Sequence, residues 1–208
     1  MKKILSMILI LMLLLSCALA EQFVDAQAVL DFMLAENAVY AAAASNDGDV
    51  SRELRRQTAE NGQSPYAVVL TCSDSRVPPE HIFNAGIGEL FVIRTAGNVV
   101  GEYELGSIEY GAEHLHARLV LVLGHSGCGA VEAALNGGAH GNIAAITDEI
   151  RACLPGECLS SEAEVLNVEN SIARIRESEI MRELEAAGEV MIAGAIYDIA
   201  TGLVRILE

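Results

Sequence analysis

Two short segments of the chain carry residue types that can do metal chemistry. Residues 72–76 read Cys-Ser-Asp-Ser-Arg, and residues 124–129 read Gly-His-Ser-Gly-Cys-Gly. Thiolate and imidazole are ligands that Zn²⁺ prefers, and catalytic zinc sites built from two cysteines and one histidine keep a fourth position open. His125 and Cys128 are three residues apart, so one turn of chain can present both. Together with Cys72 they predict a zinc site.

Three other kinds of site fit the residues of these two segments less well than a zinc site does. A disulfide between Cys72 and Cys128 would leave the imidazole of His125 and the charged residues of the first segment without a role. Residues 124–128 nearly spell the Gly-x-Ser-x-Gly elbow of serine hydrolases, but the fifth residue is cysteine. A cysteine–histidine protease dyad needs one cysteine rather than two equivalent ones. Zinc binding therefore remains the preferred interpretation, with the disulfide as the alternative.

Buried β-strands are expected directly before the two segments. Residues 67–71, 90–93 and 119–123 are short apolar runs without polar alternation, which is typical of strands buried on both faces. Helical patterns between and around them predict a mostly parallel central sheet flanked by helices. Ligands bind such α/β sheets at the carboxyl ends of the strands, where both segments fall. The remaining expected elements are helices at 23–60, interrupted at 46–49, and at 105–115, 129–136, 142–152 and 162–187, with strands at 190–196 and 202–207.

The composition narrows the class of protein. The 208 residues include 13 Lys+Arg and 29 Asp+Glu, a formal charge of −16, and 52% of them are hydrophobic. A nucleic-acid-binding protein needs clustered cations to contact phosphates, so this charge argues against one. The hydrophobic fraction argues against a disordered acidic chain. The composition therefore predicts one globular domain that does not bind nucleic acid.

The first 20 residues have the three parts of a secretory signal peptide. Lys2 and Lys3 precede an apolar run at 4–15, and residues 18–20 read Ala-Leu-Ala. The apolar run is too short for a membrane span, which needs about 20 residues. We therefore expect a signal peptide at 1–20, a domain at 21–208 and a periplasmic or secreted protein, with lipidation at Cys17 as the less favoured option.

Removal of the signal peptide would take away two lysines and leave a charge of −18. Four cysteines would remain, of which Cys153 and Cys158 bracket Leu-Pro-Gly-Glu in a predicted loop. An exported protein enters an oxidising compartment, where spare thiols tend to pair. A disulfide between these two cysteines is therefore a hypothesis of the sequence.

The two segments resemble the zinc motif of the β-class carbonic anhydrases, Cys-x-Asp-x-Arg with His-x-x-Cys. Residues 94–98, 106–110 and 197–202 also look like signatures of that family, and the resemblance extends over about 30–208. It implies reversible hydration of carbon dioxide to bicarbonate and a proton by zinc-bound hydroxide. It also implies one Zn²⁺ per subunit and an α/β subunit with an N-terminal helical arm used in dimerisation, forming a homodimer or a dimer-based higher oligomer.

The resemblance also implies roles for Asp74 and Arg76. Asp74 would accept the proton of the zinc-bound water and orient its lone pair toward carbon, while Arg76 would hold the carboxylate in a bidentate pair. In some family members the aspartate binds zinc instead, often beside a bicarbonate pocket that contains tryptophan. This chain has no Trp and carries Gln-Ser-Pro at 63–65, as plant-like members do. We therefore expect the open state, with Asp74 on Arg76.

Four further residues are assigned to substrate by the resemblance. The Gln63 side chain would contact substrate from across the dimer interface, Phe91 and Tyr110 would line an apolar pocket, and the Gly129 amide would meet the developing oxyanion. Phe91 is equally well explained as a core residue. Two alternatives remain open: hydrolysis of CS₂ or COS on the same fold, and a zinc- or thiol-binding module without turnover.

Overall fold

A five-stranded sheet forms the centre of the computed structural model, which describes residues 23, 25–43 and 46–207. The strand order is β2-β1-β3-β4-β5. The first four strands pair in parallel, and β5 runs antiparallel to β4 at one edge. The predicted mostly parallel sheet is confirmed, whereas the predicted signal peptide at 1–20 lies outside the described residues. The strands are β1 Ala67–Thr71, β2 Leu90–Arg94, β3 Leu119–His125, β4 Met191–Tyr197 and β5 Val204–Ile206.

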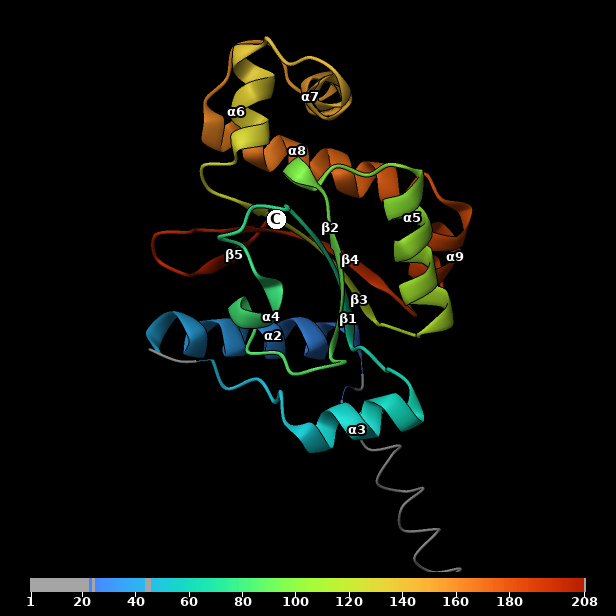
Figure 1. Cartoon of the computed structure of the whole chain (residues 1–208). Coiled ribbons are helices and arrows are strands. Elements are labelled where there is room, and N and C mark those ends of the chain that lie inside the picture. The colour runs from blue at the N-terminus through green and yellow to red at the C-terminus, as the bar shows by residue number, and fades with distance from the viewer. Residues whose placement is uncertain (1–22, 24, 44–45, 208) are drawn as a thin grey trace, which may run out of the picture.

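Helices cover both faces of the sheet (Figure 1). On one face lie α2 and α4, and on the other lie α5, α8 and α9, while α6 and α7 project beyond the carboxyl ends of the strands. The helices are α2 Ala26–Ala42, α3 Arg52–Asn61, α4 Pro79–Ile82, α5 Glu102–Glu109, α6 Gly129–Asn136, α7 Asn142–Ala152, α8 Ser160–Ile175 and α9 Glu179–Ala186, with short turns η1 Ala96–Asn98 and η2 Tyr110–His114.

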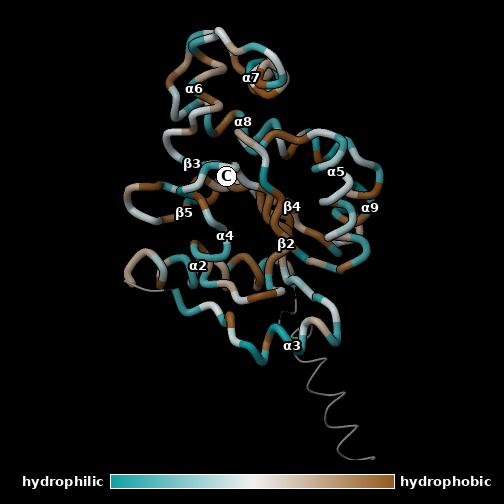
Figure 2. Tube along the Cα trace, in the orientation of Figure 1, coloured by the Kyte–Doolittle hydropathy of each residue, from teal (hydrophilic) through white to brown (hydrophobic). Residues whose placement is uncertain are grey.

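Successive residues of β1 pack on opposite faces, as the two-residue period of a strand requires. Val68 and Leu70 belong to the core beneath α5, α8 and α9, whereas Val69 belongs to the core above α2 and α4. All five residues of this strand are buried. The strands are accordingly the most hydrophobic part of the chain in Figure 2. Burial on both faces explains why the sequence of this strand shows no polar alternation.

The expected N-terminal helical arm is present as α2. Asp25 caps it by accepting a hydrogen bond from the Ala28 amide at 2.8 Å. Its residues Val29, Leu30 and Met33 are buried in the core on one face of the chain's own sheet. Within the described residues, no helix is both long enough and apolar enough to cross a membrane.

One predicted helix is divided in the structure. Residues 162–187 were expected to be continuous, but α8 ends at Ile175 and α9 begins at Glu179. Ser178 separates them because its hydroxyl accepts a hydrogen bond from the Met181 amide, which caps a new helix. The turn lets α9 pack beside α5 rather than extend past the sheet. The short elements α4 and η1, which position the site, were not predicted.

Candidate metal centre

Cys72, His125 and Cys128 meet at the carboxyl ends of two adjacent parallel strands. Cys72 directly follows β1, His125 is the last residue of β3, and Cys128 precedes the first residue of α6. One sulfur or nitrogen atom from each lies within 4.8 Å of the others. All three residues are at most 5% exposed. The structure thus brings together the three ligands that the sequence predicts.

The cluster fits a zinc ion. His125 directs Nδ1 to the Ser126 carbonyl at 3.1 Å, while its buried Nε2 has no partner among the described residues. A buried polar atom without a partner is costly, and a bound cation would satisfy it. Tetrahedral zinc with bonds of about 2.0–2.3 Å separates its ligand atoms by about 3.5–3.8 Å, which is compatible with this cluster.

The surroundings of Cys72 favour its thiolate form. The Cys128 thiol donates toward the Cys72 sulfur and lowers the pKa of Cys72 to about 4, against the opposing effect of burial. The same contact raises the pKa of Cys128. The amides of Gly97 and Asp74 also point at the Cys72 sulfur, at 3.2 and 3.4 Å. These contacts favour the thiolate of Cys72, and thiolate is the form that binds zinc.

Gly97 holds a conformation that few other residues adopt. Its φ is +69°, and a Cβ placed there would lie 2.8 Å from Ile150 Cδ1 and 3.1 Å from Ala130 Cβ. Glycine avoids both the strain of the left-handed φ and the two close contacts. This turn places the Gly97 amide 3.2 Å from the Cys72 sulfur. The sequence places Gly97 among the family signatures, and the structure supplies the physical reason.

Asp74 pairs with Arg76. The Arg76 Nε donates to Oδ1 at 2.9 Å, and its terminal nitrogen donates to Oδ2 at 2.7 Å, while the Arg76 amide also donates to Oδ1. This guanidinium holds the pKa of Asp74 well below its usual range. It also donates to the Gly127 carbonyl at 3.2 Å, so it bridges the two ligand loops. Asp74 is thus ionised and outside the three-ligand cluster.

Arg94 is a residue of the site that the sequence reasoning did not assign. From the end of β2 its Nε donates to the Cys72 carbonyl at 3.0 Å, and its terminal nitrogen donates to the Asp74 carbonyl at 2.6 Å. Two charge-assisted bonds from one planar group fix the backbone between ligand and carboxylate. Its position at the end of a predicted strand, beside the strand that leads to Cys72, is the signal that could have identified it.

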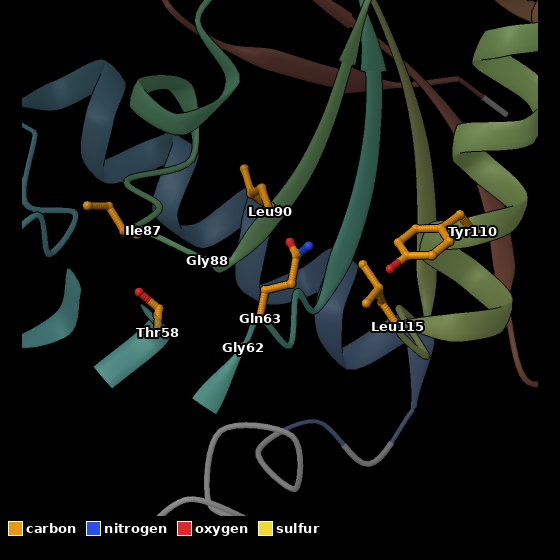
Figure 3. A pocket seen from close by; sticks show the side chains of 8 residues that line it. All are labelled: Thr58, Gly62, Gln63, Ile87, Gly88, Leu90, Tyr110 and Leu115. Carbon is orange, nitrogen blue, oxygen red and sulfur yellow. The ribbon is translucent and has the colours of Figure 1, made fainter. Parts of the chain in front are cut away.

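Gln63 and Tyr110 lie elsewhere, in an open pocket of about 680 Å³ beside the start of β2. Figure 3 shows both side chains there with Leu90 at the first position of that strand. Phe91 is next to this pocket, its ring centroid 6.0 Å from that of Tyr110. The pocket lies at the amino end of β2, so the structure does not bring these residues to the metal ligands of the same chain. The other predicted substrate residue, Gly129, directly follows Cys128.

Cys153 and Cys158 have free thiols in the structure. The Cys153 thiol donates to the Ile150 carbonyl at 3.1 Å, and burial raises its pKa. The disulfide between these two cysteines stays a hypothesis.

Comparison with known proteins identifies the family. The sequence profile described as carbonic anhydrase matches residues 67–204, well over half of the chain, and includes all three ligands. The chain belongs to the β-carbonic anhydrase family. A carbonic anhydrase of Mycolicibacterium smegmatis is 37% identical over 73% of this chain and 79% of its own length. Carbonic anhydrase 2 of Mycobacterium tuberculosis is 38% identical over 68% of this chain and 73% of its own length.

Solved β-carbonic anhydrases share the fold. The Aspergillus fumigatus enzyme CafA superposes with a TM-score of 0.69 at 26% identity, covering 86% of this chain and 90% of its own. A Coccomyxa β-carbonic anhydrase, solved in complex with acetazolamide, gives 0.63 at 29% identity, covering 76% of this chain and 86% of its own. The family is a zinc family, and the Cys72–His125–Cys128 cluster supplies the ligand set that it requires.

Proposed function

We propose that this chain catalyses the reversible hydration of carbon dioxide to bicarbonate and a proton at a zinc ion held by Cys72, His125 and Cys128. The observation that carries the proposal is the buried cluster of two sulfurs and an imidazole whose Nε2 has no partner in the part of the chain that the structure describes. Family membership supports the same activity.

Bound zinc supplies Lewis acidity, which makes water a nucleophile near neutral pH. The protein must orient that water, and Asp74 is placed to do so. Arg76 keeps the Asp74 carboxylate ionised, so each oxygen can accept but not donate a hydrogen bond. An O–H donated to Asp74 leaves the lone pair of the water oxygen free to face the carbon of the substrate.

Gly129 supports charge that develops on the substrate oxygen. It is the first residue of α6, so its amide precedes the intrahelical hydrogen bonds and is free to donate. The helix N-terminus adds a partial positive charge at the same position. Donors fixed before the reaction stabilise a developing oxyanion without reorganising.

The positions of the predicted substrate residues support a homodimer. Gln63 and Tyr110 line the pocket at the amino end of β2, whereas the metal ligands lie at the carboxyl ends of the strands. These residues can reach a metal centre only if it belongs to another subunit. A twofold axis beside β2 would bring the amino end of this strand toward the carboxyl end of its counterpart.

The position of β2 in the sheet supports the same arrangement. It is an edge strand, and Leu90, Phe91, Val92 and Ile93 are only partly buried within one chain. An apolar edge strand with unpaired backbone groups promotes aggregation unless another element covers it. A second copy of β2 would cover it, and a dimer-based higher oligomer would preserve this contact.

Export is the proposed localisation. The signal peptide at 1–20 would direct the domain at 21–208 to the periplasm or the medium, and Cys17 lipidation is the secondary route. The acidic mature chain suits a substrate that needs no electrostatic attraction, because CO₂ is neutral. Mass spectrometry of the exported protein tests this: we expect a chain that begins at Glu21, and retention of residues 1–20 would contradict it.

The activity is tested by CO₂ hydration and by inhibition. Zinc-loaded protein should accelerate hydration, and acetazolamide, which the Coccomyxa relative binds, should inhibit it. Asp74→Asn with Arg76 intact is the sharper variant, because it keeps the zinc ligands while removing the carboxylate. Retained zinc with activity reduced on the order of 10²-fold is expected for a lost proton-accepting group. Unchanged activity in that variant would refute the role of Asp74.

A further inference from the structure

Helix α8 has three polar side chains on its buried face. Glu164, Asn167 and Ser171 are 6%, 1% and 1% exposed, although a helix normally presents apolar side chains to a core. Their spacing of three and four residues places them in one row. This row faces the two loops that carry the metal site, and each member makes a hydrogen bond to one of them.

Glu164 holds the loop that follows β3. Its Oε1 accepts hydrogen bonds from the Gly127 amide at 2.7 Å and from the Cys128 amide at 3.2 Å. A buried carboxylate is costly unless it is well hydrogen-bonded, and these two amides supply that compensation.

Asn167 and Ser171 hold the turn that follows β2. The Asn167 Nδ2 donates to the Gly97 carbonyl at 2.6 Å, and the Ser171 hydroxyl donates to the Asn98 carbonyl at 2.9 Å. The amide of Gly97 in turn donates to the Cys72 sulfur at 3.2 Å. Asn167 thus holds the residue whose amide donates to the Cys72 sulfur. Glu164 contacts the amide of the other cysteine ligand, Cys128, directly.

We propose that Glu164, Asn167 and Ser171 are positioning residues that hold the two ligand loops at the spacing required by the metal. The inference rests on the metal site of the proposed function. No other described side chain hydrogen-bonds to the Gly127 and Cys128 amides. Groups that orient metal ligands typically change metal affinity by 10–100-fold when removed. Removing Glu164 would leave the Gly127 and Cys128 amides without this acceptor and would free the ligand loop to move.

Zinc affinity, measured by competition with a chelator, tests the proposal independently of CO₂ hydration. We expect Glu164→Ala to raise the zinc Kd on the order of 10–100-fold. Glu164→Gln keeps a carbonyl oxygen for the two amides and should stay within about threefold of the unmodified protein. Glu169→Gln makes the same chemical change at an exposed position of α8 and is the matched control. Amide exchange at Gly127 in metal-free protein should accelerate only in Glu164→Ala.

Asn167→Ala provides a second variant on the other loop. It should raise the zinc Kd about tenfold and change the charge-transfer spectrum of the cobalt-substituted protein, because Gly97, whose amide donates to Cys72, is no longer held by Asn167. If Glu164→Ala does not fold, this variant decides the matter alone. Zinc affinity within threefold of the control in every folded alanine variant would overturn the proposal. Inactive protein that binds zinc with these differences would contradict the proposed function but not this inference.

Discussion

Gln63 and the metal ligands of one chain lie at opposite ends of β1, and this separation makes a shared active site testable. The strand spans Ala67–Thr71. Five residues span four steps of about 3.3 Å, so its ends lie about 13 Å apart, well beyond the reach of a glutamine side chain. In a dimer, Gln63→Ala therefore damages the partner's site, whereas Cys72→Ser damages the site of its own chain.

A mixed dimer of these two variants separates the possibilities. If Gln63 serves the partner's metal centre, one site carries both defects and the other carries neither. Random pairing of equal amounts makes half of the dimers mixed, so about one quarter of all sites are intact. If Gln63 serves its own chain, no site in the mixture is free of a defect. Gln63→Ala alone should lose about tenfold or more in activity, since it removes a hydrogen bond to substrate.

The assay is CO₂ hydration by mixed dimers purified through two different affinity tags. We expect the mixed dimer to recover about half of the wild-type activity per dimer, because one of its two sites is complete. Dimers of each single variant are the controls. Activity of the mixed dimer no higher than that of the Gln63→Ala dimer would refute the shared site and the proposed twofold axis beside β2.

Two further variants test the local geometry. Gly97→Ala should destabilise the fold by about 2–4 kcal/mol, from its left-handed φ and from overpacking against Ile150 and Ala130, and urea unfolding checks this; stability equal to wild type would contradict the reported turn. Arg76 lowers the pKa of Asp74 in the folded state below its unfolded value of about 3.8–3.9. The pair therefore stabilises the protein fully above that unfolded pKa. Its contribution is lost as the pH falls toward and through the lower pKa of the folded state. The stability of wild type relative to Asp74→Asn should accordingly be constant from pH 5 to 8 and shrink at more acidic pH, and a difference that grows on acidification would contradict the pairing.

Much of the site could be predicted because its signals are local. Cys72 and His125 stand at the ends of apolar runs that predict buried strands, and parallel strands bring their carboxyl ends together without any knowledge of the loops. The same pattern at 90–93 predicts burial on both faces, which is wrong within one chain, because β2 is an edge strand and is only partly buried. The bidentate pair of Asp74 and Arg76 is also local, since the two residues are only two positions apart. These features require residue type, spacing and strand order and nothing more.

The supporting residues could not be predicted because their contacts are distant in sequence. Glu164 contacts the Cys128 amide from 36 positions away, and Asn167 contacts the Gly97 carbonyl from 70 positions away. In the sequence alone, both residues resemble the exposed polar face of a helix. The break before α9 was missed for a related reason, because the cap formed by Ser178 competes with an uninterrupted helical pattern.

The most direct test of the account is stopped-flow CO₂ hydration at pH 8–9, with zinc content measured on the same samples. Two thiolate ligands weaken the Lewis acidity of zinc relative to three histidines, so activity should rise toward alkaline pH. The account predicts one zinc per chain and strong catalysis, with both lost in Cys72→Ser. Zinc-loaded protein that does not accelerate hydration would contradict it.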